Sequence, residues 1–503
     1  MNAARDQADV VVVGAGGSGL AAALATCRAG GSVIIIDKAD QPGGTTGLAV
    51  GSFTAAGTTL QARSGVVDDP AHHIEDVAGF APPACEARNH AELRAYFLRH
   101  AAAACNWLED LGVLFQGPMP EPPNRAPRMH NAVPRAHAYI STFVRHLARH
   151  GVEVQCRTRV VGLETRHGRV TGVVAETPAG RRTFHARRGV VLAAGDYAAA
   201  DDLIARFKGA EFTGMRHVNP QATGDGQRMV ESAGGALVNM DITYGPELRF
   251  APAPQGLLDR WPTRGPAAWL ARALIPALPG AVVRAVAMRR VVAWQHPEHN
   301  LFTQGAILVN AKGERFADET DPGARELALA RQPGASGWII LDARIQQMFS
   351  AWPNFISTAP SIAYAYVRDY LRLRPDLCRA GSDLARVATA AGLPGSAVIA
   401  AVAARNRALA AGSIDDVGRS ASGPALTGPW LILGPAYPYI TITEGGASID
   451  LTCRVLRPDG TPIPGLYAIG QNGLGGQILF GHGLHIAWAI TSGMLVGRAL
   501  GGR

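Results

Sequence analysis

The stretch DVVVVGAGGSGLAAALATCRAGGSVIIIDK, residues 9–38, predicts a strand, a glycine turn, a helix and a second strand. Its two runs of β-branched residues are typical of strands buried on both faces of a parallel sheet. In the pattern G-x-G-x-x-G, Gly14 permits a tight turn, Gly16 lets a pyrophosphate approach the backbone, and Gly19 allows close packing of helix on strand. Asp37 ends the second strand, where a carboxylate can accept hydrogen bonds from ribose hydroxyls. The stretch therefore predicts a Rossmann-like unit that binds a dinucleotide.

The composition is that of a compact enzyme with more than one domain. The chain has 503 residues, of which 47% are hydrophobic and 17% charged. This is too apolar for a disordered chain and too often interrupted by charge for a protein of many membrane spans. At about 150 residues per domain, the length predicts two or three domains. The net charge of +8 comes almost wholly from dispersed arginines, with lysine only at Lys38, Lys208 and Lys312, so we expect no nucleic-acid partner.

Two features predict a cytoplasmic location. The six cysteines show no Cys-x-x-Cys pair, no haem-attachment motif and no iron–sulfur spacing, which is typical of reduced thiols. Residues 1–6 lack the basic-then-apolar pattern of a signal peptide. We therefore expect a cytoplasmic protein without a metal site.

Changes in composition along the chain predict an α/β fold made of three segments. Residues 1–245 and 428–503 are rich in strand patterns and glycine, and we expect them to form one Rossmann-like domain around a parallel sheet. Residues 246–427 are richer in proline, arginine and amphipathic helical patterns, and we expect an inserted α+β capping domain there. Its helices are predicted at Ile362–Leu373, Asp383–Ala391 and Ser396–Ala411.

The C-terminal segment contains a long uncharged stretch. Residues 460–497 include ten glycines and no Asp, Glu, Lys or Arg. Such a stretch is either deep core or the wall of a cofactor site. A helix is predicted from Leu484 to Leu495, and its first backbone N–H groups would be free to meet an electron-rich ligand.

Motifs along nearly the whole chain resemble those of a known family. They are Gly14 to Gly19, Gly43-Gly44-Thr45-Thr46, Thr223-Gly224-Asp225-Gly226, GERFADE at 313–319, Glu444-Gly445-Gly446 and GLYAIG at 465–470. Together they resemble the flavoproteins that include soluble fumarate reductases and 3-ketosteroid dehydrogenases. The resemblance implies an FAD domain interrupted by a capping domain, with the active site between them. No His occurs between Gly43 and Ala56, where relatives with covalent flavin carry one, so the FAD is expected to be noncovalent.

The resemblance also implies which residues line the FAD. Carried over position by position, they are Gly14, Gly16, Ser18, Gly19, Asp37, Lys38, Gly43, Gly44, Thr45, Thr46, Gly195, Asp225, Gly470, Gln471, His485 and Ile486. Gln471 departs from the Glu that is common after this glycine, which leaves a neutral hydrogen bond to the ribityl chain. No second strand–G-x-G-x-x-G–helix unit appears, so we expect electrons to pass to an external acceptor, such as a quinone, oxygen or a redox protein.

The catalytic residues of the family do not carry over to this chain. The family reaction needs an acid or base for the proton next to a carbonyl or carboxylate, and a group that polarises the substrate oxygen. Gly323 stands near the position of the catalytic Arg or Tyr of relatives, and Leu479 near that of a second Tyr of the steroid enzymes. Gly483 matches the glycine whose N–H helps to hold the keto oxygen. Arg325 is close enough in sequence to replace the missing Arg, although an exposed helical Arg is the preferred interpretation.

Replacement acid–base residues are predicted at His482, Tyr439, Tyr244 and His296. His482 flanks Gly483 in the uncharged stretch, where an imidazole is costly unless it is hydrogen-bonded or used. Tyr439 lies on the strand that returns from the cap in relatives, and Tyr244 lies where fumarate reductases have a substrate-binding His. Each has a structural alternative: a Tyr with its hydroxyl at the surface or, for His296, a loop histidine.

These observations predict an FAD-dependent α,β-desaturase of a small cyclic ketone or related carbonyl compound. A fumarate-type reductase of an unsaturated carboxylate is one alternative, and a non-catalytic FAD-binding interaction subunit is another. Residues 257–294 carry six Arg against one Asp among many apolar side chains. They predict either a packed pair of cap helices or a peripheral contact with a membrane surface.

Overall fold

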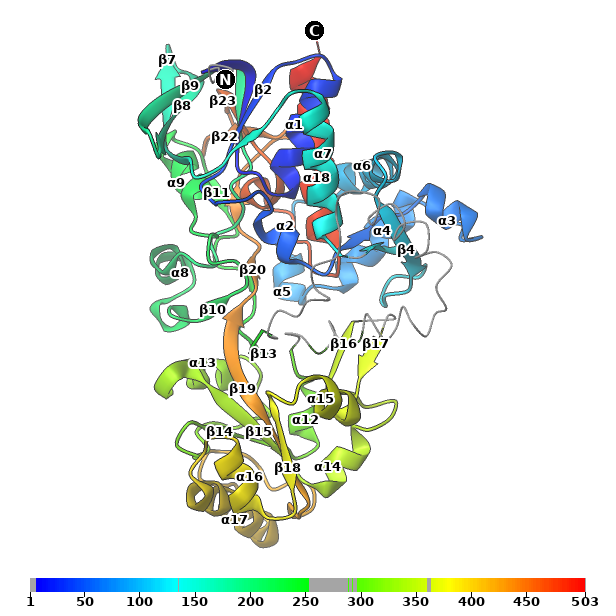
Figure 1. Ribbon diagram of the computed structural model, residues 1–503, viewed down its shortest axis with the longest axis vertical. Helices are drawn as coiled ribbons and strands as arrows, with labels where there is room; N and C mark the ends of the chain where they lie inside the picture. The colour runs from blue at the N-terminus through cyan, green and yellow to red at the C-terminus, as the bar shows by residue number, and fades with distance from the viewer. Residues whose placement is uncertain are drawn as a thin grey trace. The chain divides into compact units, whose positions relative to one another are not determined.

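The computed structural model describes residues 6–133, 135–252, 288, 292, 296–359 and 363–502, and the chain divides into two compact units (Figure 1). The first unit contains Met1–Lys208, His217–Thr243 and Ile442–Arg503, and the second contains Gly209–Arg216 and Tyr244–Thr441. The second unit extends past residue 427, where the sequence predicted the chain to return. The reason is that strand β19 (Trp430–Ile440) pairs with strands of the second unit.

A largely parallel sheet forms the centre of the first unit. Strand β1 (Gln7–Val13) lies between β2 (Val33–Ile36) and β9 (Gly180–Leu192) and runs parallel to both. β6 (Val154–Gln155) extends the sheet beyond β2, and β23 (Pro462–Ala468) brings the C-terminal segment alongside β9. Residues 10–12 of β1 are fully buried, as the uninterrupted valines predicted. The α/β fold around a parallel sheet is therefore confirmed.

Antiparallel strands complete this sheet. β7 (Arg159–Arg166) and β8 (Arg169–Thr177) form the predicted hairpin, and β8 pairs in turn with β9. His167 and Gly168 form its turn with φ of 50° and 74°, the left-handed pair that a tight hairpin favours. β22 (Arg454–Leu456) pairs with β23 at the other side of the sheet.

Helix α18 (Leu484–Gly501) packs a glycine face directly on α1 (Gly17–Arg28), and the two helices lie side by side in Figure 1. Gly493, Gly497 and Gly501 recur every four residues and therefore share one face of α18. A Cβ atom on these glycines would lie 2.4, 2.3 and 2.5 Å from carbonyl oxygens of α1. No larger side chain fits there, so this end of the uncharged stretch is deep core.

The remaining elements of the first unit flank this core. The helices are α2 (Gly44–Leu48), α3 (Thr59–Arg63), α4 (Pro70–Asp76), α5 (Pro83–Glu86), α6 (Ala91–Asp110), α7 (His137–Arg149), α8 (Asp201–Phe207) and α9 (Asp225–Ser232). The strands are β3 (Ser52–Thr54), β4 (Leu114–Met119), β5 (Met129–Val133), β11 (Leu237–Val238), β20 (Ile442–Thr443) and β21 (Gly446–Ala447). β3, β5 and β4 form a small antiparallel sheet of their own.

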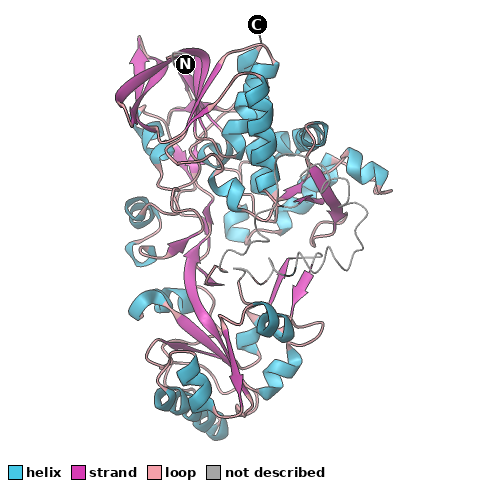
Figure 2. Cartoon of the chain, in the orientation of Figure 1, coloured by secondary structure: helices cyan, strands magenta, loops and turns pink. Residues whose placement is uncertain are grey.

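An antiparallel sheet forms the centre of the second unit (Figure 2). β19 pairs with β13 (Glu247–Phe250), β15 (Gly337–Leu341) and β18 (Cys378–Gly381), and β15 also pairs with β14 (Ile307–Asn310). Its other elements are α12 (Asn300–Thr303), α13 (Ala324–Ala330), α14 (Ala343–Met348), β16 (Ser357–Ala359), β17 (Ala363–Ala365), α15 (Val367–Leu373), α16 (Leu384–Ala390) and α17 (Gly395–Ala411). Two-residue strands β10 (Arg216–His217) and β12 (Thr243–Tyr244) lie where the chain passes from one unit to the other.

The helices predicted near residues 384 and 396 are confirmed as α16 and α17, but the helix predicted from Ile362 begins later. α15 starts at Val367, because Asp369 accepts a hydrogen bond from the N–H of Tyr366 and caps this end. Just before it, β17 pairs with β16 as a hairpin. The region predicted to contact a membrane, residues 257–294, lies outside the described residues except for Met288 and Val292.

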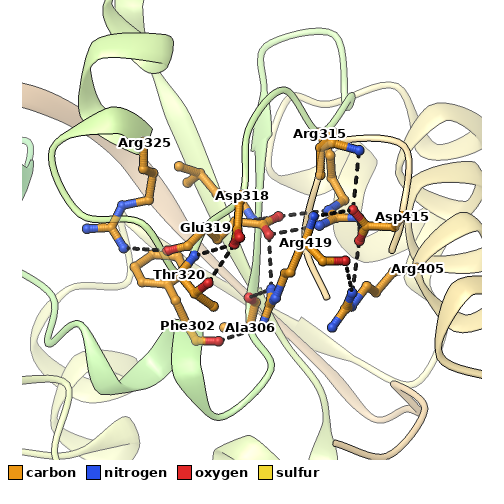
Figure 3. Close-up of polar contacts among 12 residues, drawn as sticks. Phe302, Ala306, Arg315, Asp318, Glu319, Thr320, Arg325, Arg405, Asp415 and Arg419 are labelled. Carbon is orange, nitrogen blue, oxygen red and sulfur yellow. Dashed lines mark hydrogen bonds and ion pairs between the residues drawn. The ribbon is translucent and has the colours of Figure 1, made fainter. Parts of the chain in front are cut away.

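A buried network of charged side chains joins two segments of the second unit (Figure 3). Glu319 accepts hydrogen bonds from Arg315 at 2.7 Å and Arg419 at 2.9 Å. Asp415 accepts from Arg315 at 2.7 Å and from Arg405 at 2.9 Å. All five side chains are almost completely buried. Each buried charge is therefore paired, as burial requires, and the GERFADE motif serves the packing of this unit.

Arg325 belongs to the same region and corrects a prediction. The preferred interpretation of an exposed helical Arg is wrong, because Arg325 is only 4% exposed. Its guanidinium donates to the carbonyl of Glu319 and to Glu326, and it lies over the ring of Phe302. These contacts hold the guanidinium inside the unit and explain why an Arg is buried on α13.

Candidate active site

The glycine turn between β1 and α1 has two glycines required by packing and one that faces open space. A Cβ atom on Gly14 would lie 2.3 Å from the carbonyl oxygen of Ala193, and one on Gly19 would lie 1.9 Å from the carbonyl oxygen of Gly14. On Gly16 it would approach nothing closer than 3.9 Å. Gly16 also caps α1 without a side-chain hydrogen bond. The turn thus leaves room for a pyrophosphate where a helix presents free N–H groups.

Asp37 lies at the end of β2 and closes one side of this turn. Its carboxylate accepts hydrogen bonds from the N–H of Ala15 at 2.6 Å and from the N–H of Ala39 at 2.8 Å. Each carboxylate oxygen keeps lone pairs for a further donor. The predicted place of a ribose-binding acid beside the glycine turn is therefore present in the structure.

Lys38 and Asp225 are brought together, although they are 187 positions apart. The ammonium of Lys38 lies 2.7 Å from Asp225 Oδ2 and also bonds to Thr223. Asp225 Oδ1 accepts from Arg159 at 3.2 Å. Both residues were predicted to line FAD, and the structure adds that the Asp225 carboxylate holds the Lys38 side chain in place.

The segment from Gly43 to Thr46 lies against the glycine turn. Gly43 donates its N–H to the carbonyl of Ala15 at 3.0 Å, and a Cβ atom on Gly44 would lie 3.1 Å from the Cα of Gly16. Thr46 accepts a hydrogen bond from the N–H of Gly17 at 3.3 Å. Thr45 Oγ1 accepts a hydrogen bond from the side-chain amide of Asn219, which connects the start of α2 to the loop before α9.

The C-terminal segment meets the N-terminal one at this site. A Cβ atom on Gly470 would lie 2.7 Å from Ser18 Oγ, so these two predicted FAD residues are in contact. Gln471 donates its side-chain amide to the carbonyl of Thr443 at 2.5 Å, a bond that an ionised Glu at this position cannot make. A Cβ atom on Gly195 would meet no atom within 4 Å.

These residues fit FAD. Gly16 and Gly195 both leave space beside the backbone, and the amide nitrogen of Asn472 is buried without a hydrogen-bond partner among the described residues. A buried unpaired donor beside open backbone is what a polar cofactor would satisfy. Gly14 to Gly19, Asp37 and Gly43 to Thr46 would hold the nucleotide and pyrophosphate.

His482 forms a close pair with Glu121, which the sequence analysis did not predict. Glu121 Oε1 bonds to Nδ1 of His482 and accepts the backbone N–H of the same residue at 3.0 Å. Glu121 is buried, whereas the His482 side chain is 53% exposed. The imidazole is therefore held on one side and accessible on the other. Glu121 follows β4, 361 positions earlier in the chain.

A second histidine–carboxylate pair lies three residues further on. His485 Nε2 lies 2.7 Å from Glu444 Oε1, and Glu444 Oε2 accepts the N–H of Leu479 at 3.1 Å. Glu444 is fully buried, and the His485 side chain is 17% exposed. Asp196 is also buried here. Burial raises the pKa of Asp196 to about 6, against the N–H of Ala198 and the nearby His485, which both lower it.

Gly483 lies between the two pairs and caps α18. Its φ of 84° lies in the left-handed region, and a Cβ atom there would come within 3.0 Å of β3. Its position as a helix cap leaves the first N–H groups of α18 without partners from the preceding turn. The helix begins at Leu484, as predicted. Ile486 is partly buried against the core in its first turn.

The other predicted acid–base residues belong to the second unit. Tyr439 is buried on β19, opposite Glu247 of β13. Tyr244 is partly buried at the start of this unit. His296 Nε2 lies 3.9 Å from Glu298 Oε1. A catalytic role for these three residues stays a prediction.

Comparison with known proteins gives the class of this chain. Residues 9–477 match the family described as FAD binding domain. A probable fumarate reductase of Shewanella frigidimarina is 28% identical over 92% of this chain and 69% of the relative. The 3-oxosteroid 1-dehydrogenase of Mycobacterium tuberculosis is 24% identical over 92% of each chain.

Solved structures resemble the chain over almost its whole length. The open conformation of a flavocytochrome c3 fumarate reductase has a TM-score of 0.74 at 25% identity, covering 99% of this chain and 79% of that one. A 3-ketosteroid dehydrogenase of Rhodococcus jostii RHA1 has a TM-score of 0.59 at 23% identity, covering 99% and 97%, which shows a shared fold.

The chain belongs to the FAD binding domain family, and FAD is its cofactor. It is an FAD-dependent oxidoreductase of the group that acts on CH–CH bonds, related to fumarate reductases and 3-oxosteroid 1-dehydrogenases. Among the described residues, no helix combines the length and hydrophobicity that crossing a membrane requires.

Proposed function

We propose that the protein is an α,β-desaturase of ketones or related carbonyl compounds, with His482 as the base. The observation that carries the proposal is the half-exposed imidazole of His482 directly before Gly483, at the N-terminal end of α18. Gly483 corresponds to the glycine whose N–H helps to hold the keto oxygen in the steroid enzymes. A base and an oxyanion donor on neighbouring residues are what removal of a proton next to a carbonyl requires.

In this proposal His482 and Gly483 have separate roles. The N–H of Gly483 donates to the carbonyl oxygen of the substrate and stabilises the negative charge that develops on it. Nε2 of His482 takes the proton from the α-carbon, and the new double bond forms between the α- and β-carbons. The hydride leaves the β-carbon, and bound FAD would supply the acceptor for it. An external acceptor, such as a quinone, oxygen or a redox protein, then takes the electrons.

Reduction of an unsaturated carboxylate is the second candidate. Two relatives, at 28% and 26% identity, are fumarate reductases, which favours this candidate. The resemblance puts Gly323 near the position of the proton-donating Arg of those enzymes, and the Arg325 guanidinium is held in buried contacts of its own. Both observations count against a fumarate-type reductase.

The test is anaerobic bleaching of the yellow holoenzyme. Cyclohexanone-like ketones and 3-ketosteroids are expected to bleach the flavin, and succinate is not. His482→Asn is expected to slow bleaching by about 100-fold or more, because a positioned base contributes at least that much. If His482→Asn bleaches as fast as the wild type, His482 is not the base. If Tyr439→Phe is slow instead, Tyr439 takes the proton. Reoxidation of reduced enzyme by fumarate, with no response to ketones, would establish the second candidate.

A further inference from the structure

Glu121 Oε1 lies against one ring nitrogen of His482, Nδ1, and against its backbone N–H. An ionised carboxylate only accepts hydrogen bonds. With an ionised Glu121, the bond between Glu121 Oε1 and Nδ1 of a neutral His482 requires the hydrogen on Nδ1. The lone pair is then on Nε2, on the opposite side of the ring. A base needs such a lone pair facing its substrate.

The position of Glu121 is rigid, although it lies in a turn. Glu121 stands between Pro120 and Pro122, whose rings restrict the backbone on both sides. Its carbonyl accepts the N–H of Asn124 at 2.9 Å, and the Asn124 side chain accepts from Arg128 at 2.9 Å. The turn between β4 and β5 is therefore fixed to residues beneath it.

Arg128 connects this turn to a buried cluster. It is fully buried and donates to both oxygens of Asp68, at 2.7 and 2.9 Å, and to Asp76 at 2.7 Å. Such bidentate contacts orient a guanidinium firmly. The backbone of Glu121 is thus tied to this cluster through Asn124, whereas its carboxylate bonds only to His482 through Oε1 and leaves Oε2 buried without a partner among the described residues.

The backbone of His482 is held as well. Its carbonyl accepts a hydrogen bond from Thr54 Oγ1 at 2.6 Å, and its N–H donates to Glu121 Oε1 at 3.0 Å. Gly483 packs so closely on β3 that no side chain would fit. The ring can therefore rotate little without breaking its bond to Glu121.

We propose that Glu121 is a positioning residue that holds His482 in the Nδ1–H tautomer and balances the positive charge that forms when Nε2 takes a proton. This inference rests on the proposed function. Glu121 does not meet the substrate. Its role is that of the orienting acid in other base–carboxylate pairs, where loss of the acid leaves the base in the wrong tautomer.

The variants separate the hydrogen bond from the charge. Glu121→Leu removes both, whereas Glu121→Gln keeps an acceptor oxygen and loses the charge. The control is Glu164→Leu, because Glu164 lies 2.8 Å from Nδ1 of His185 in a surface hairpin of the first unit. This pair has the same chemistry and no place in the site.

Two measurements on the holoenzyme test the proposal. Nitrogen-15 NMR of labelled histidines, assigned by His482→Asn, is expected to show His482 as the Nδ1–H tautomer in the wild type and in Glu121→Gln, and to show loss of this preference in Glu121→Leu. The limiting rate of anaerobic flavin bleaching by a ketone is expected to fall about 100-fold in Glu121→Leu, with little change in the ketone concentration that gives half this rate, and to fall less in Glu121→Gln. Glu164→Leu is expected to change neither.

The outcomes distinguish the two proposals. An Nε2–H tautomer in the wild type, or an unchanged tautomer and rate in Glu121→Leu, overturns the role of Glu121. If Glu121→Leu does not fold, an unchanged limiting rate of bleaching in Glu121→Gln overturns the charge-balancing role. NMR needs no substrate, so it tests the role of Glu121 independently of the reaction. If NMR shows the expected tautomers but ketones do not bleach the wild type, the proposed function is refuted and the role of Glu121 is not.

Discussion

The two histidine–carboxylate pairs beside Gly483 have the same chemistry and opposite geometry. Glu121 bonds to Nδ1 of a half-exposed His482, whereas Glu444 bonds to Nε2 of a mostly buried His485. His482 therefore keeps Nε2 for a ligand, and His485 keeps Nδ1. The same type of contact thus does not define a role. The role depends on which ring nitrogen is left without the carboxylate and on how exposed the ring is. These two features favour His482 for proton transfer and His485 for a fixed structural position.

Removal of Glu444 should have the largest effect on stability. Its two oxygens bond to His485 and to the N–H of Leu479, and all of this is buried. Glu444→Ala leaves both donors unpaired and is expected to lower the free energy of unfolding by about 3–5 kcal/mol. Glu121→Ala should cost only about 1 kcal/mol, because its partner His482 reaches water. Urea unfolding of both apoproteins measures the difference, and equal losses would contradict the contrast between the pairs.

Asp196 should make stability near His485 dependent on pH. Burial raises its pKa to about 6 from an ordinary 3.8, so the folded protein binds this proton more tightly than the unfolded chain. The stability that the proton contributes is complete below pH 3.8 and is lost as pH rises through 6, a loss of about 3 kcal/mol.

Asp196→Asn removes this loss. It should therefore be more stable than the wild type at pH 7.5 and similar at pH 4, as measured by urea unfolding at both values. A difference that is the same at both pH values would mean that Asp196 is ionised at no extra cost in the folded protein.

His73 should make the support behind Glu121 sensitive to acid, which is the opposite pH dependence to that of Asp196 beside His485. Burial lowers the pKa of His73 to about 3, with the Arg128 guanidinium adding to the effect. The unfolded chain therefore gains protons first as pH falls below 6.5, and stability drops by about 2 kcal/mol between pH 7 and pH 5. His73→Leu lacks this histidine, so its free energy of unfolding should fall by about 2 kcal/mol less than that of the wild type between pH 7 and pH 5. Thermal unfolding of the two proteins at pH 7 and pH 5 checks this. An equal loss of stability in both proteins would contradict the prediction.

The fold was predictable where its determinants are close in sequence. The βαβ unit, Gly14 to Gly19 and Asp37 occupy one stretch of thirty residues, so spacing alone predicted their geometry. The start of α18 at Leu484 was predictable because Gly483 precedes an uninterrupted apolar run. Some of the residues carried over for FAD are in contact with one another, as Ser18 with Gly470 and Lys38 with Asp225 illustrate, and their role in binding FAD stays a prediction.

The candidate site was predictable only in part. Glu121 was missed because it lies in a proline-rich turn without periodic pattern, and its partner is 361 positions away. Asp196 was missed because its significance is its burial, which nothing in the run after Gly195 indicates. Arg325 was misread because helical periodicity does not reveal that Glu326 and Phe302 enclose its guanidinium. Long-range pairing of charged groups is not encoded in local spacing.

The glycine face of α18 restricts how this protein can evolve. The helix has 18 residues and spans about 27 Å at 1.5 Å per residue, with His485 near one end and Gly501 at the other. One inserted residue would rotate everything after it by about 100°, so the glycines would leave α1 or His485 would leave Glu444. The length of α18 is therefore fixed by its contacts with α1 at one end and with Glu444 at the other.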